Sequence, residues 1–151
     1  MFLGKEMFLM MQVIIFFAGV VVSYLWSSIV IRYMLKRVGY SHPNFAFVPF
    51  LNIYAMSDAL SGGLVMVLGK FEVAHDIFKF WWLISFLIMF IPVVGPLVGI
   101  LLNFGCLITI YTFFYKFFKI PANYVFFLSL ISVFIPFVFL IMGTAFMVKK
   151  L

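Results

Sequence analysis

Long apolar runs separated by short groups of charged residues dominate the chain. Stretches without Asp, Glu, Lys or Arg extend over residues 7–31, 38–57, 80–115 and 120–148. An α-helix rises about 1.5 Å per residue, so about 20 residues cross a hydrocarbon core of about 30 Å. The pattern therefore predicts membrane-spanning helices, and the first run is long enough for one crossing.

The third run is too long for a single helix, because its 36 residues would extend about 54 Å. Pro92 and Pro96 each disfavour helix in the residue before them, and Gly95 tolerates a positive φ. These three residues predict a hairpin that joins helices at about 78–91 and 96–115.

The last run predicts a further span at about 121–148. Pro121 suits the first turn of a helix, and Pro136 is expected to kink the helix in its interior. Together the runs predict an all-α integral membrane bundle of about four transmembrane helices, forming a single domain over residues 1–151.

The second run is also long enough to cross, but His42, Pro43 and other polar or helix-breaking residues interrupt it. Irregular backbone is not tolerated where it faces lipid. We therefore interpret 43–79 as an interfacial or re-entrant segment between the first two spans, with a helix at about 50–60 and a turn at Ser61, Gly62 and Gly63. The alternative is a fifth span.

Basic residues are expected on the cytoplasmic side of a membrane, and four spans place both termini on one side. The seven basic residues of the loops are Arg32, Lys36, Arg37, Lys70, Lys79, Lys116 and Lys119, and the three near the termini are Lys5, Lys149 and Lys150. This count favours termini outside. If the hairpin of the third run does not cross, the count is again seven against three with the C-terminus inside, so its side stays open.

The composition supports a lipid environment. The chain is 68% hydrophobic and 9% charged, whereas soluble domains average roughly 45–50% and 25%. The net charge of +6 favours anionic lipid headgroups over nucleic acid, because the basic residues flank apolar runs. Four carboxylates, two histidines and the lone Cys106 offer little material for catalysis, so we expect no enzyme, cofactor or metal site.

A second helix is predicted just before the third run. Glu72, His75, Asp76 and Lys79 are spaced at i, i+3, i+4 and i+7, which places them on one polar stripe of an amphipathic helix lying on the headgroups. Glu72 and His75 also have the spacing of a di-metal ligand pair. One chain lacks the other ligands, so that alternative requires a homodimer.

A polar cluster of Asn52, Tyr54 and Asp58 lies in a mostly apolar neighbourhood. An acidic residue close to the membrane is costly unless it is paired or hydrated. Asp58 is interpreted as a headgroup-level residue beside Lys70. If a ligand or ion contact exists, the cluster is its first candidate.

Small residues recur at four-residue spacing inside two spans and let helices approach closely. They are Gly19, Ser23 and Ser27 in the first span, and Gly95, Gly99 and Asn103 in the third. We interpret both stripes as packing faces, with Asn103 adding an interhelical hydrogen bond.

The order of features resembles a loosely defined family of small, uncharacterised bacterial four-helix integral membrane proteins. The residues that carry the resemblance are Val48–Tyr54, which reads as a (V/I)PFxNxY motif, then Trp81 and Trp82, the hairpin Ile91–Val94, and Phe113–Lys116. It covers roughly residues 43–143. Family members usually carry an asparagine shortly after the hairpin proline, where this chain has Gly95 and Pro96. The resemblance implies a bacterial inner membrane location and brings no activity with it.

These observations predict a non-catalytic accessory or scaffolding subunit of a bacterial membrane assembly, or a homo-oligomer, joined through the small-residue faces. The expected partners are the anionic lipid bilayer and other membrane subunits or a second copy. The alternative is a channel, transporter component or small-molecule-binding protein that uses Asn52, Tyr54 and Asp58.

Overall fold

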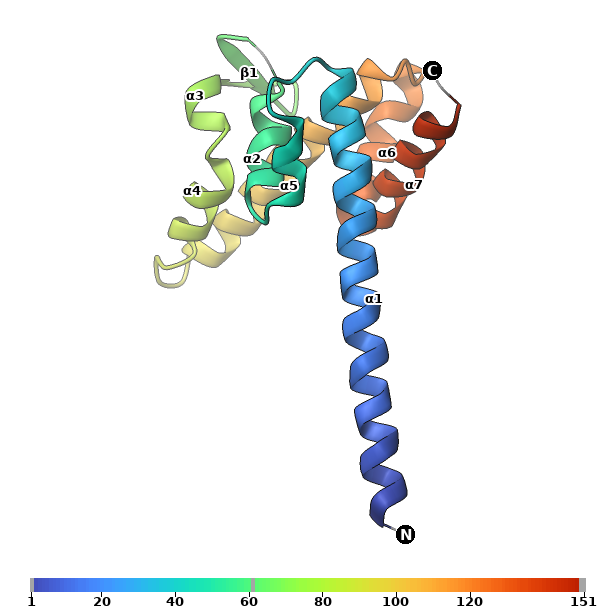
Figure 1. Ribbon diagram of the computed structural model, residues 1–151. Helices are drawn as coiled ribbons and strands as arrows, with labels where there is room; N and C mark the ends of the chain where they lie inside the picture. Colours follow the sequence, from blue (N-terminus) through green and yellow to red (C-terminus); the bar gives the residue numbers. More distant parts are fainter. Residues whose placement is uncertain (1, 61, 150–151) are drawn as a thin grey trace.

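A computed structural model describes residues 2–60 and 62–149 as a mainly helical chain (Figure 1). In chain order the elements are α1 (Phe2–Arg37), the 3-10 helix η1 (Pro43–Phe47), α2 (Leu51–Asp58), β1 (Leu64–Val67), β2 (Phe71–Ala74), α3 (His75–Phe78), α4 (Trp81–Ile88), α5 (Gly95–Phe117), α6 (Ala122–Phe134) and α7 (Pro136–Val148). Helices dominate as predicted, but a small β-hairpin interrupts them.

Helix α1 is a single rod that extends well beyond the rest of the molecule (Figure 1). Its last turn carries Lys36 and Arg37, whose charges are favourable at the negative end of the helix dipole. Gly39 then adopts a φ of +79° and donates to the Lys36 carbonyl at 3.2 Å. This left-handed glycine ends the helix and turns the chain toward η1.

The third apolar run folds back on itself as predicted, although the second helix is only eight residues long. Helices α4 and α5 form the two arms of the hairpin. The residue with a positive φ in the turn is Val93, at +67°, and not Gly95. Gly95 instead begins α5, where a side chain would overlap the Ile88 carbonyl oxygen, so glycine is needed there for close approach.

The predicted fourth span is wrong as a single helix, because the chain reverses at Ile135. This residue is extended, with φ −128° and ψ 81°, and Pro136 starts the new helix α7. Helix α6 descends along α5 until Phe134 packs 5.3 Å from Phe104, measured between ring centroids. Helix α7 then returns, and Phe146 stacks 4.4 Å from Phe118.

The return of α7 places the two ends of the chain at opposite ends of the molecule (Figure 1). The start of α1 lies at one end, whereas the end of α7 lies beside the end of α1. The bundle with four crossings is therefore not confirmed. Among the described residues, two helices are long and apolar enough to cross a membrane, Lys5–Arg37 and Gly95–Phe117.

Helix α7 packs against α1 and directs Phe139 toward aromatic rings of α5. The Phe139 ring lies 4.4 Å from that of Tyr111 and 5.9 Å from that of Tyr115. On its other side, a Cβ on Gly143 would overlap Val30 of α1. Close contact at this glycine joins the upper part of α1 to the helical body.

Hydroxyl groups connect α5 to α6 inside this apolar core. Thr112 donates to Ser129 at 3.0 Å, and the Tyr115 and Ser132 hydroxyls lie 2.6 Å apart. Buried polar atoms are costly unless they are paired, so these contacts fix the relative position of the two helices.

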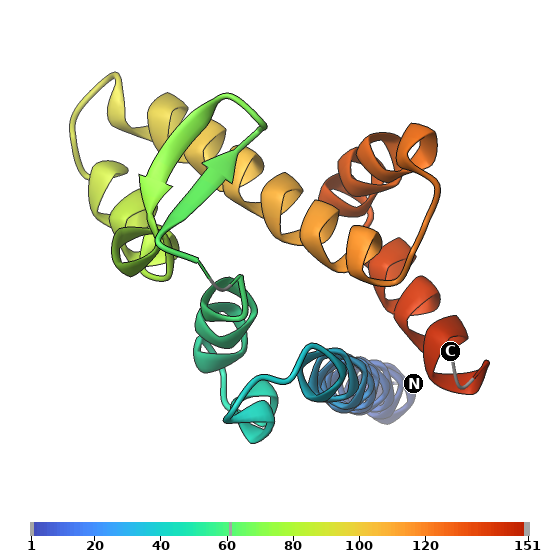
Figure 2. The same cartoon turned by 90° about the horizontal axis from the view of Figure 1, so that it is seen from above.

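The amphipathic helix expected around residues 70–79 is wrong in its first half. Residues 64–67 and 71–74 pair as an antiparallel hairpin, in which Val65 and Val67 are buried and their neighbours are exposed. Leu68 and Gly69 have φ values of +53° and +69°, and Lys70 donates to the Val67 carbonyl at 3.1 Å. These values match the tight turn typical of hairpins, and the hairpin lies over α5 (Figure 2).

Candidate functional site

The structure separates the predicted cluster of Asn52, Tyr54 and Asp58. The Asn52 Oδ1 accepts a hydrogen bond from the Ile53 amide at 2.7 Å, within the first turn of α2. The Tyr54 ring packs 5.5 Å from the ring of Phe80. Asp58 ends the helix and faces different partners, so the three side chains do not form one binding group.

Asp58 instead belongs to a polar junction with Tyr40 and His75. The Tyr40 hydroxyl donates to the Asp58 Oδ2 at 2.9 Å. The His75 Nε2 lies 3.2 Å from the Asp58 carbonyl oxygen and 3.6 Å from its Oδ1. This polar junction joins the loop after α1, the end of α2 and the start of α3. Burial, followed by the Asp58 carboxylate, raises the pKa of Tyr40 well above its ordinary value.

The predicted stripe of Glu72, His75, Asp76 and Lys79 is also distributed differently. Glu72 lies in β2, opposite Met66, and His75 begins the one-turn helix α3. Lys79 donates to the exposed Asp76 carboxylate at 2.8 Å. The hydrogen bond from the Lys79 ammonium lowers the pKa of Asp76. Within the described part of the chain, no three His, Cys, Asp or Glu side chains come close enough to hold a metal ion.

The small residues of α5 pack against α4. A Cβ on Gly99 would lie 2.8 Å from the Met89 Cγ and 3.0 Å from the Ser85 carbonyl oxygen. The Asn103 Nδ2 donates to the Ser85 Oγ at 2.6 Å and to the Gly99 carbonyl at 2.9 Å. With Gly95, these residues hold α5 close to α4 and to the buried Ser85. Of the two predicted hairpin prolines, Pro92 lies in the turn and Pro96 lies in the first turn of α5.

The small residues of α1 lie in two different environments. Ser23 and Ser27 border Pro136 and Leu140 of α7. Gly19 lies one turn further toward the start of α1, and a Cβ built on it meets nothing within 4 Å. The stripe therefore begins beside α7 and continues onto the free part of α1.

A groove of about 570 Å³ lies between the β-hairpin, α5 and the start of α6. Its walls are mainly apolar side chains, and Thr109, Thr112 and Lys116 supply its polar groups. The full lining is Leu60, Leu64, Val65, Met66, Leu68, Gly69, Ile108, Thr109, Thr112, Phe113, Lys116, Ala122, Val125 and Phe126. Small-molecule sites typically occupy roughly 300–1,000 Å³, so this groove has the volume of a binding site.

Sequence reasoning missed the groove and the partners of Asp58. Tyr40 and His75 lie 18 and 17 residues from Asp58, and no short-range spacing connects them. The hydroxyl contacts between α5 and α6 left a weak signal, since Ser129 and Ser132 stand at i and i+3 in an otherwise apolar run. Such pairs mark the face of a buried helix that meets a polar neighbour.

No family model, curated protein or solved structure matches this chain. The family resemblance based on Val48–Tyr54 therefore stays a prediction, and the function must be argued from the geometry alone.

Proposed function

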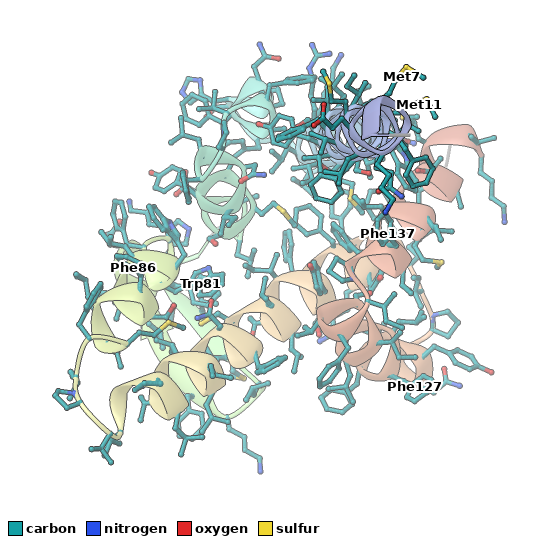
Figure 3. The ribbon with its side chains drawn as sticks, turned by 90° about the horizontal axis from the view of Figure 1, so that it is seen from below. Met7, Met11, Trp81, Phe86, Phe127 and Phe137 are labelled. Atoms are coloured by element: carbon teal, nitrogen blue, oxygen red, sulfur yellow. The ribbon has the colours of Figure 1, made fainter. Side chains whose placement is uncertain are left out.

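We propose that this chain is an integral protein of a bacterial cell membrane and a non-catalytic accessory or scaffolding subunit. In this proposal α1 crosses the bilayer and presents its free half to another membrane helix. The observation that carries the proposal is the isolation of that half: the apolar window within Lys5–Arg37 has no buried residue. Met7 and Met11 project from it, away from the body (Figure 3). An apolar surface of this length requires lipid or a partner helix.

The distribution of basic residues supports an orientation of the protein in the membrane. The end of α1, the β-hairpin, α3, the turn after α5 and the end of α7 lie at one end of the molecule (Figure 1). These segments carry or adjoin Arg32, Lys36, Arg37, Lys70, Lys79, Lys116, Lys119 and Lys149. Lys5 lies at the other end of α1 (Figure 1), and Lys150 lies outside the described residues. Basic residues are retained on the cytoplasmic side, so the basic end is proposed to face the cytoplasm.

The tips of both helical hairpins are apolar and point away from the basic end. In the α4–α5 turn, Phe90 is 71% exposed and Val93 is 92% exposed; in the α6–α7 turn, Phe134 is 68% exposed. Pro92, Pro96 and Pro136 have no amide hydrogen, and the Ile135 amide is bonded to the Ile131 carbonyl at 2.7 Å. Unpaired backbone groups make irregular turns costly in hydrocarbon. Because several amide donors of these turns are absent or hydrogen-bonded, that cost is lower here, and we propose that both hairpins enter the membrane without crossing it.

Aromatic side chains on the outside of the helical body are also consistent with its insertion into the membrane. Phe86 of α4 and Phe127 of α6 point outward, whereas Trp81 points into the body (Figure 3). The body is thereby proposed to lie in the cytoplasmic half of the bilayer, with α1 alone reaching the opposite face.

Gly19 tests the association through α1. Replacing Gly19 with leucine blocks close approach of a second helix, and we expect association to weaken about tenfold, equivalent to about 1.4 kcal/mol. Energy transfer between labelled copies in lipid vesicles measures self-association. Co-purification from native membranes measures association with other subunits.

The matched control is Val21→Leu, which places the same side chain at a similar depth on the opposite face of α1. We expect this variant to associate like the wild type in both measurements. Equal association of wild type, Gly19→Leu and Val21→Leu contradicts the proposal.

A further inference from the structure

We propose that the groove between the β-hairpin, α5 and α6 binds an anionic phospholipid, with an acyl chain along its apolar walls and the phosphate beside Lys116. This inference rests on the proposed membrane location. It adds a ligand and a site that are separate from the free face of α1.

The walls provide the apolar half of such a site. Leu64 of β1 is 62% exposed and Phe126 of α6 is 61% exposed, although both line the groove. Val125 and Ile108, at its base, are buried. An uncovered apolar channel gains from receiving a hydrocarbon chain, because burial removes both surfaces from contact with water.

One basic side chain lines the groove, that of Lys116. Lys116 lies in the last turn of α5, and none of the ion pairs formed within the described part of the chain involves it. An anionic headgroup therefore meets the positive charge of Lys116 without competition from a carboxylate already paired with it.

The start of α6 adds a second feature that attracts anions. Ala122 lines the groove and is the first residue of this 13-residue helix. The free amide groups at a helix N-terminus carry a partial positive charge that favours phosphate groups. Lys116 and the N-terminus of α6 thus border the same groove, on two different elements.

One wall of the groove is held in place, because α5 binds the hairpin turn. The Leu68 amide donates to the Thr109 Oγ1 at 3.2 Å, and this hydroxyl donates to the Gly105 carbonyl at 2.9 Å. The Leu68 side chain also approaches Gly105, where a Cβ would lie 3.5 Å from it. A wall fixed in advance lowers the ordering cost of binding.

The position of the groove relative to the proposed membrane surface favours a phospholipid over a free fatty acid. Its charged end coincides with the basic end, where the headgroups of the cytoplasmic leaflet lie in the proposed orientation. Lys116, in the last turn of α5, and Ala122, at the start of α6, line the groove. A bilayer phospholipid reaches this position by sliding in the leaflet, with its phosphate already at the level of Lys116.

Native mass spectrometry of the full chain in detergent tests the site with three probes: phosphatidylglycerol, phosphatidylcholine with the same acyl chains, and oleate. We expect the wild type to retain phosphatidylglycerol in preference to phosphatidylcholine. Lys116→Gln should weaken phosphatidylglycerol binding about fivefold, the effect of one basic side chain on an anionic headgroup. Ala122→Trp, which fills the groove from an exposed position, should weaken both phospholipids.

Two control variants keep the charge and the volume changes outside the groove. Lys149→Gln removes a basic residue from the same end of the molecule, and Phe127→Trp enlarges an outward-facing side chain of α6. Both should bind phosphatidylglycerol like the wild type, and circular dichroism should show the same helical content in all variants.

Three outcomes overturn the inference: equal retention of the two phospholipids, unchanged binding in Lys116→Gln or Ala122→Trp, or preferential binding of oleate that depends on Lys116. The last outcome assigns the groove to fatty acids. Failure here is distinguishable from failure of the proposed function, because Lys116→Gln should leave the association measured with Gly19→Leu unaffected.

Discussion

The Ser57 hydroxyl joins two segments that are far apart in the chain. It donates to the Ile53 carbonyl and accepts from the Trp81 Nε1, each at 2.9 Å. Ser57→Ala leaves the buried indole N–H without a partner, and we expect a loss of about 1–3 kcal/mol in the free energy of unfolding. Tryptophan fluorescence during unfolding in detergent measures it. The exposed Ser41→Ala is the control and should unfold like the wild type.

Tyr40 predicts a pH dependence at the alkaline end of the scale. Because burial and Asp58 raise its folded-state pKa above the ordinary value of 10.0, the stabilisation is fully present below about pH 10 and is lost as the pH rises beyond it. Tyr40→Phe should lower stability by about 1 kcal/mol near neutral pH. Its difference from the wild type should shrink above pH 10 in unfolding titrations. A difference that stays constant up to pH 12 contradicts this interpretation.

At the scale of single residues, the sequence identified Asp58 as unusual but did not reveal which side chains surround it. Asp58 stood out because a carboxylate is costly near lipid. Its partners Tyr40 and His75 come from other elements, and only the fold brings them together. Asn103, in contrast, hydrogen-bonds to a neighbouring helix as expected, since a single amide in an apolar helix has few other ways to pair.

Among the helices, the contact of α1 with α7 depends on Gly143. A side chain there must displace Val30 and Met34, both of which are fully buried. Gly143→Val should therefore lower the free energy of unfolding by about 1–3 kcal/mol, measured as a lower unfolding midpoint in detergent. Gly19→Val, which enters open space on α1, is the control with the same gain in side-chain volume. Equal midpoints of the two variants contradict this account.

The β-hairpin offers a second test between elements. Thr109→Val keeps the shape of the side chain but removes the acceptor of the Leu68 amide, whose left-handed conformation costs about 1–2 kcal/mol for a residue with a Cβ. We expect faster amide hydrogen exchange in β1 and β2 and unchanged exchange in α7. Thr144→Val, on α7, is the control and should leave the hairpin unaffected.

Secondary-structure elements were predictable where one sequence signal dominated. The predictions were wrong where two signals competed. Pro92 and Pro96 identified the α4–α5 turn, because Pro92 lies in the turn and Pro96 suits the first turn of the helix that follows it. Around residue 72 the charged residues had helical spacing, but Val65, Val67 and the turn at Gly69 favoured strands that pair with each other. The helical spacing of Glu72, His75, Asp76 and Lys79 was therefore misleading. Residues 71–74 form a strand because they pair with residues 64–67, and the sequence of residues 70–79 alone does not reveal that pairing.

For the whole molecule, labelling of single cysteines tests the proposed path through the membrane. In a Cys106→Ala background, cysteines at Ser41 and Lys70 should react from one side of the membrane and a cysteine at Lys5 from the other. Val93→Cys should react from neither side, because the hairpin tip is proposed to lie in hydrocarbon. Reaction of Val93→Cys from the Lys5 side contradicts the proposed path, because α4 and α5 would then cross the membrane as the four-crossing prediction requires.

The number of crossings was the least predictable property. An apolar run of 29 residues fits one kinked span or two short antiparallel helices equally well by length. Pro136 indicated a break, but the size of the bend depends on contacts such as those of Phe134 with Phe104 and of Phe146 with Phe118. Such contacts join residues about 30 positions apart in the chain, so the apolar run alone does not reveal them.

The reversal at Ile135 has a consequence for biosynthesis. In the proposed arrangement, every charged segment between α1 and the end of α7 stays on the side where the ribosome synthesises it. Once α1 has been inserted, no hydrophilic loop has to be translocated, and each later hairpin enters the bilayer from that same side. The insertion machinery therefore needs to open for this polypeptide only once.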